Sequence, residues 1–158
     1  MDIKKYKTKI ELHLTPIWHK EPPICAVQFS KNIFFKEEIL ESKIYYYEEY
    51  LPAGNYDITL DFLNKKNNDS TEGKDKAIKI DKVICNNIER EKFVWQGMYK
   101  PIYPEPWLSQ QKKLGNELKS IVTPSSYLGW NGRWTLNYSV PIFAWIHKVE
   151  NLGWIYDQ

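Results

Sequence analysis

Aromatic side chains that neighbour amides and charged groups are the most chemically distinctive residues of this sequence. Trp130, Asn131 and Arg133 stand together in the segment Gly-Trp-Asn-Gly-Arg, and Tyr127 precedes them. A second aromatic cluster comprises Tyr99, Tyr103 and Trp107. The C–H face of a pyranose stacks on aromatic rings, while its hydroxyls need polar partners. Both clusters are therefore candidate carbohydrate-binding sites. The alternative is that these rings pack in the core or in a protein interface.

A polar loop carries the residue types that bind calcium. The oxygen-bearing side chains between residues 64 and 75 are Asn64, Asn67, Asn68, Asp69, Ser70, Glu72 and Asp75. Calcium takes about six to eight oxygen ligands, but this loop lacks the fixed spacing of an EF-hand. If calcium is the cofactor, we expect Asp75 first, then Asp69 and Glu72, to bind it. The alternative is a solvated loop whose charge is offset by Lys65, Lys66 and Lys74.

Catalytic patterns are absent from the sequence. It contains no Gly-x-Ser-x-Gly nucleophile motif and no glycine-rich phosphate loop. The histidines His13, His19 and His147 lack the spacing of a zinc site, and we expect them at the surface. A glycosidase needs two carboxylates that face each other across a cleft, which sequence spacing does not reveal. We therefore predict that the chain is not an enzyme.

Two-residue alternation of apolar and polar side chains predicts that strands build the elements that position these residues. We expect strands over residues 8–15, 24–30, 32–41, 42–51, 56–63, 77–84, 93–95 and 133–147. One short helix is expected over residues 107–119, where apolar side chains recur at helical spacing. Short alternating strands with little helix favour an all-β fold, an antiparallel β-sandwich of the jelly-roll kind. Residues 1–158 are expected to form a single domain in which strands 56–63 and 77–84 pair.

The stretch 51–88 carries the motifs of a known family. Gly54 and Tyr56 begin one strand, and the segment from Asp75 to Asn86, Asp-Lys-Ala-Ile-Lys-Ile-Asp-Lys-Val-Ile-Cys-Asn, forms a second alternating unit after the polar loop. These motifs resemble the calcium-dependent, xylan-binding type of carbohydrate-binding module. The resemblance covers about a quarter of the chain, and Asn87 stands where that family has glycine. It implies a β-sandwich and, beyond that, sugar binding assisted by calcium.

Composition and charge restrict the partners. The formal net charge is only +2, which argues against nucleic acid because nucleic-acid binding needs a concentrated basic surface. The first 14 residues lack the apolar core of a signal peptide, and no stretch is apolar enough to insert into a membrane. Aromatic residues make up 15% of the chain, a composition that also suits protein contacts.

Cys25 and Cys85 are expected to be reduced thiols.

Two classes of function remain. In the first, the chain is a non-catalytic accessory protein that binds glycan and is displayed on a larger assembly, such as the surface of a phage virion. In the second, it is a purely structural component of such a particle, as a capsid decoration, fibre or tail protein. Other subunits of the assembly, a surface glycan or both are then its partners. Jelly rolls recur in viral shells, so both classes agree with the expected fold.

Overall fold

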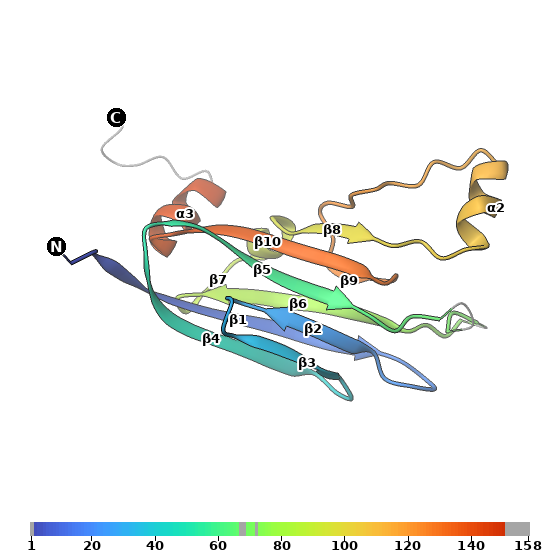
Figure 1. Ribbon diagram of the computed structural model, residues 1–158, viewed down its shortest axis with the longest axis horizontal. Helices are drawn as coiled ribbons and strands as arrows, with labels where there is room; N and C mark the ends of the chain where they lie inside the picture. Colours follow the sequence, from blue (N-terminus) through green and yellow to red (C-terminus); the bar gives the residue numbers. More distant parts are fainter. Residues whose placement is uncertain (1, 67–68, 72, 151–158) are drawn as a thin grey trace.

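Two antiparallel sheets face each other in the computed structural model, which describes residues 2–66, 69–71 and 73–150 (Figure 1). One sheet contains strands in the order β4-β1-β6-β7, with β9 also paired to β6, and the other has the order β3-β2-β5-β10-β8. The strands are β1 (Lys5–Ile17), β2 (Ile24–Gln28), β3 (Phe34–Glu38), β4 (Lys43–Pro52), β5 (Gly54–Phe62), β6 (Ala77–Cys85), β7 (Ile88–Glu89), β8 (Met98–Pro101), β9 (Tyr127–Leu128) and β10 (Gly132–Val140). The predicted all-β antiparallel sandwich is confirmed. Jelly-roll connectivity remains a prediction.

The core lies between the sheets because each long strand turns alternate side chains inward. On β10 the inward series is Trp134, Leu136, Tyr138 and Val140, and on β1 it is Ile10, Leu12 and Leu14. The register pairs Trp134 with Leu60 of β5 and with Tyr99 of β8. Cys25 and Cys85 are buried with this core and carry free thiols. The two-residue period of the sequence therefore specified which side chains are buried.

The unit formed by β5, the polar loop and β6 connects the two sheets. β5 pairs with β2 and β10, whereas β6 pairs with β1, β7 and β9 in the opposite sheet. The prediction that strands 56–63 and 77–84 pair with one another is therefore wrong. The intervening loop is long enough to cross from one sheet to the other, whereas direct pairing of neighbouring antiparallel strands needs only a short turn.

Two segments predicted as strand are helical. Residues 91–95 form α1 (Glu91–Trp95), in which the adjacent residues Phe93 and Val94 are both buried. Consecutive strand residues point to opposite faces, so a one-sided strand could not bury both. The expected strand over 133–147 ends at Val140, and α3 (Ile142–Val149) follows Pro141. Its buried residues, Ile142, Trp145 and Ile146, recur at intervals of three and four, which is helical spacing.

The helix predicted over 107–119 is present but shorter, as α2 (Trp107–Lys113). It buries none of its residues completely, and it lies in a long excursion between β8 and β9 that projects from one end of the sandwich, opposite α3 (Figure 1). Among the residues described, no helix is long and apolar enough to cross a bilayer. The excursion lies at the same end as the β5–β6 loop, so the two segments are available to build one site.

Trp134 anchors the core, and its replacement tests the packing. The side chain is fully buried, and a Cβ added at Gly97 would lie only 2.0 Å from the indole nitrogen, so the backbone of residue 97 closes directly over the ring. We expect Trp134→Ala to reduce the free energy of unfolding by about 3–5 kcal/mol in denaturant titrations. Trp95→Ala is the control because Trp95 is 48% exposed. Equal losses in the two variants would contradict this assignment of the core.

Candidate functional site

Two loops that are distant in sequence meet at the α2 end of the sandwich. Tyr99 of β8 forms an isolated bridge with Val122, and the Ile102 amide donates to the Asn131 carbonyl over 2.6 Å. Gly132 allows this close approach: its φ is +150°, and a Cβ there would lie 2.3 Å from the Lys100 carbonyl oxygen. These contacts place the excursion that carries α2 beside the β9–β10 turn.

The meeting loops bring the two predicted aromatic clusters into one. The ring centroids of Trp107 and Trp130 are 4.8 Å apart with an interplanar angle of 35°, and Tyr103 contacts both rings at 5.8 and 6.0 Å. The Trp130 amide donates to the Tyr99 hydroxyl over 3.0 Å, and that hydroxyl donates to the Trp130 carbonyl. The sequence offered two separate candidate clusters, and the structure joins them in a single surface.

Lys65 and Asp75 form a charged floor beneath these rings. The Lys65 ammonium pairs with the Asp75 carboxylate, donates to the Lys76 carbonyl over 2.7 Å, and lies 5.6 Å from the centroid of the Trp130 ring. Asn131 holds the backbone of Lys65 from both sides: its amide oxygen accepts from the Lys65 amide over 2.6 Å, and its amide nitrogen donates to the Lys65 carbonyl over 3.1 Å. Asn131 therefore positions the floor.

Asp75 is the most strongly perturbed carboxylate at this end. Its oxygens accept hydrogen bonds from Lys65, Ser70 and Tyr127, the last over 2.5 Å. Burial raises the pKa of Asp75, but these hydrogen bonds outweigh burial and hold the pKa at about 2. Burial, followed by the bond to this carboxylate, raises the pKa of the Tyr127 hydroxyl. Asp75 is therefore an anionic acceptor at neutral pH and Tyr127 a neutral donor.

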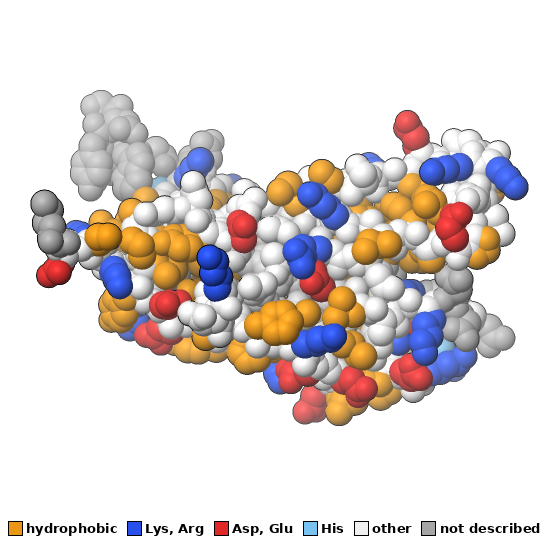
Figure 2. Space-filling model, viewed as in Figure 1, with side chains coloured by type: hydrophobic (Ala, Val, Ile, Leu, Met, Phe, Trp, Pro, Cys, Tyr) orange, Lys and Arg blue, Asp and Glu red, His pale blue; other side chains and the backbone are white. Residues whose placement is uncertain are grey.

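Two hollows share this floor, and we call them together the aromatic groove. The first has a volume of about 370 Å³ and is lined by Asp75, Tyr99, Tyr103 and Tyr127; the second, also about 370 Å³, is lined by Pro104, Trp107 and Gln110. Both are lined by Lys65, Ser70 and Trp130. Figure 2 shows hydrophobic side chains gathered beside α2 at this end of the molecule. The groove combines aromatic walls with a polar floor.

A second lysine lies in the interior at the base of the same loop. The Lys76 side chain is 1% exposed; its ammonium donates to the Asn64 carbonyl over 3.0 Å and lies 3.5 Å from a carboxylate oxygen of Asp69. Asp69 also accepts from the Lys66 amide over 2.7 Å, and its carbonyl contacts the His19 ring at 2.8 Å. A buried charge needs such partners, so the pair fixes the base of the loop.

The predicted calcium ligands Asp69 and Asp75 each face a lysine ammonium instead of one another. Glu72 lies outside the described residues. Within the described ranges, no group of three His, Cys, Asp or Glu side chains is arranged to hold a metal ion. Calcium at Asp75 would have to displace Lys65. Calcium binding by this loop therefore stays a prediction.

The structure brings together most, but not all, of the predicted carbohydrate-binding residues. Tyr99, Tyr103, Trp107, Tyr127 and Trp130 line the aromatic groove, and Asn131 supports it. Arg133 does not: it lies on the outer face of the second sheet and pairs with Asp61 at 2.7 and 3.0 Å.

Sequence analysis missed the groove contributions of Lys65, Ser70 and Gln110. Lys65 was expected only to offset loop charge, and its placement under Trp130 depends on the fold. His13, His19 and His147 are half-buried, and none belongs to a metal-binding group among the residues described.

Comparison with known proteins provides no independent assignment: no family model, curated protein or solved structure matches the chain. The resemblance to xylan-binding modules accordingly stays a prediction.

The pKa of Asp75 predicts a pH dependence of stability. A carboxylate whose folded pKa lies below its unfolded value stabilises the fold above about pH 4 and loses that contribution as pH falls towards about 2. The free energy of unfolding should therefore fall over this window, and Asp75→Asn should flatten the fall. Asp57→Asn is the control, because the Asp57 carboxylate is exposed and has no hydrogen-bond partner among the described residues. Equal slopes for the wild type and Asp75→Asn would contradict the assignment.

Calcium binding is tested by thermal unfolding. If calcium replaces Lys65 at Asp75, binding to the native state raises the melting temperature as calcium rises to about 10 mM. Asp75→Ala should abolish the response, and Asp57→Ala should retain it. A melting temperature that is independent of calcium would show that the loop is a surface feature held by lysines.

Proposed function

We propose that the protein is a non-catalytic saccharide-binding protein whose site is the aromatic groove. The observation that carries this proposal is the meeting of rings from two loops, Tyr103 and Trp107 with Tyr127 and Trp130, over the charged floor of Lys65 and Asp75. Trp130 lines both hollows, so neighbouring sugar units of one chain could contact the same ring.

The chemistry of the groove suits a pyranose. Tyr127, which is 43% exposed, and Tyr103 offer apolar ring surface to the C–H face of a sugar. The Asp75 carboxylate already accepts from Lys65, Ser70, Tyr127 and the Lys76 backbone, so it orients the Ser70 and Tyr127 hydroxyls, whose oxygens accept hydrogen bonds from sugar hydroxyls. The amide of Gln110 supplies both a donor and an acceptor in the second hollow.

We further propose that the protein is an accessory β-sandwich displayed on a larger assembly, such as a phage virion, with other subunits of the assembly as partners. Exposed apolar side chains support a protein interface at the side where β3 and β4 end their sheets. These are Phe34, Phe35, Ile44, Tyr46 and Tyr50. Apolar side chains beside unpaired strand edges are a common basis for association. This surface also favours the second candidate function, a purely structural particle component without glycan binding.

Replacement of Trp130 tests saccharide binding. Trp130→Ala removes the ring shared by both hollows, and we expect it to weaken binding to any glycan retained on an array by about tenfold or more, or about 1.4 kcal/mol. Its effect on the free energy of unfolding should be smaller than that of Trp134→Ala, because Trp130 is only half-buried. Trp95→Ala is the matched control, since it removes an exposed tryptophan away from the groove.

The outcomes separate the two candidate functions. Lost glycan binding in Trp130→Ala with normal incorporation into particles supports the saccharide-binding function. Absence of glycan binding by the wild type, together with incorporation that Tyr46→Ala and Tyr50→Ala reduce, supports the purely structural function. Unfolding of Trp130→Ala would contradict the division of the tryptophans into core and groove.

A further inference from the structure

The outer face of the second sheet carries a row of short polar side chains at the end near α3. The register pairs Asn55 of β5 with Ser139 of β10, and Asp57 with Asn137. Asn55, Asp57 and Asn137 are exposed, whereas the intervening core-facing residues of both strands are largely buried. Two amides, a carboxylate and a hydroxyl are thus brought side by side on adjacent strands.

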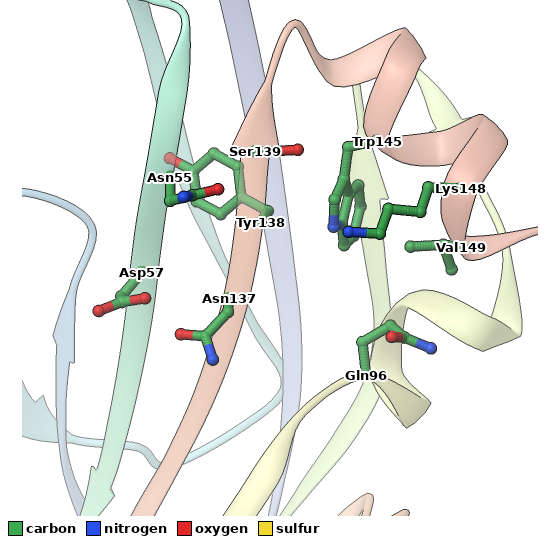
Figure 3. A pocket seen from close by; sticks show the side chains of 9 residues that line it. All are labelled: Asn55, Asp57, Gln96, Asn137, Tyr138, Ser139, Trp145, Lys148 and Val149. Carbon is green, nitrogen blue, oxygen red and sulfur yellow. The ribbon is translucent and has the colours of Figure 1, made fainter.

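α3 converts this face into a cleft. Beyond Pro141 the helix packs beside β10. Its Trp145 and Lys148 side chains form a wall opposite Asn137, and Gln96 lies below this wall in the view of Figure 3. The open hollow that they line has a volume of about 570 Å³. We call this hollow the sheet cleft; it shares no lining residue with the aromatic groove and lies nearer the opposite end of the sandwich.

The polar groups that line the sheet cleft have no side-chain partners in the part of the chain that the structure describes. Among the described residues, no side-chain hydrogen bond or ion pair engages Asn55, Asp57, Gln96, Asn137, Ser139 or Lys148. Arg133 and Asp61, on the same face of the sheet but outside the cleft, are paired at 2.7 Å. The aromatic groove differs too, because Asp75, Lys65 and Asn131 are already hydrogen-bonded there. The sheet cleft therefore offers more free hydrogen-bonding capacity.

Trp145 supplies an independent observation. Its side chain is only 6% exposed, yet the indole N–H has no acceptor among the described residues. In Figure 3 the indole nitrogen and the Lys148 ammonium lie on the side of the ring that faces β10 and Asn137. Although the residue is nearly buried, its indole nitrogen is not among the fully buried, unpartnered polar atoms of the described residues, so the N–H is open to the cleft that Trp145 lines. An acceptor on a ligand would bind this donor there.

We infer that the sheet cleft is a second saccharide-binding site, which holds a pyranose by hydrogen bonds rather than by stacking. Side-chain amides both donate to and accept from sugar hydroxyls, whereas an ionised carboxylate only accepts. Asn55, Asn137 and Trp145 supply the donors, and Asp57 supplies an acceptor. Because Trp145 is nearly buried, no open ring face is available for stacking. The inference goes beyond the proposed function and uses none of its groove residues.

The Trp145 indole resonance gives a direct test by NMR titration. The probes are the methyl glycosides of glucose, galactose, mannose and xylose, each added to about 100 mM, where a site with a Kd of about 1 mM is nearly saturated. Trp145→Phe, which keeps an aromatic ring but removes the N–H, identifies the resonance. We expect at least one glycoside to shift it saturably, and Asn137→Ala to weaken that binding about tenfold. The indole resonance of Trp134, in the core, should not move.

Matched variants decide between the sites. Thr135→Ala alters the same face of β10 outside the cleft and should leave the Trp145 titration unchanged, as should Trp130→Ala in the aromatic groove. Failure of every glycoside to shift the Trp145 resonance overturns the inference. A shift that Trp130→Ala abolishes also overturns it, because the signal then originates in the groove. If no glycan binds the aromatic groove of the wild type while the Trp145 resonance still titrates, the proposed groove site is refuted and the sheet cleft stands.

Discussion

Two lysine ammonium groups buried beneath the β5–β6 loop are the constraint on which this end of the molecule depends. Lys65 and Lys76 are both nearly inaccessible, and a charge removed from water is stable only with partners close by. The Asp75 and Asp69 carboxylates and the backbone carbonyls of residues 64 and 76 provide them. Loss of one partner from such a pair typically costs about 3–5 kcal/mol. The pairs therefore hold the loop in one conformation, and the floor of the aromatic groove with it.

Because the loop connects strands of opposite sheets, the lysine pairs also fix the two sheets relative to the groove. The Asn131 side chain binds both backbone groups of Lys65, and Trp130 is its neighbour in sequence. This contact therefore fixes the position of Trp130 relative to the loop. The result is a preorganised site with aromatic walls and few free polar groups, and preorganisation reduces the entropy that a ligand would have to overcome. The sheet cleft differs, since its polar side chains have no partner among the described residues and its aromatic ring is nearly covered.

Local periodicity predicted much of the fold, and long-range contacts determined the remainder. The inward series from Trp134 to Val140 followed from alternation alone. Phe93 and Val94 were misassigned because an apolar run too short to show its period fits a strand or a helical turn equally well. The aromatic members of the groove were recognisable by residue type, but their union required the contact between Ile102 and Asn131. The sheet cleft depends on the register of β5 with β10 and on the turn at Pro141, neither of which is encoded within one strand.

The excursion that carries α2 has a consequence for how such a protein can diversify. Its two ends are clamped together where Tyr99 meets Val122, and α2 buries none of its residues completely. Sequence and length can therefore change between these clamps with little effect on folding, because insertions in a surface loop with closed ends carry a small entropic penalty. Yet this tolerant segment supplies Tyr103, Trp107 and Gln110 to the groove. Evolution or design can thus replace the residues between Tyr99 and Val122, and with them one wall of the groove, while the sequence of the two sheets stays unchanged.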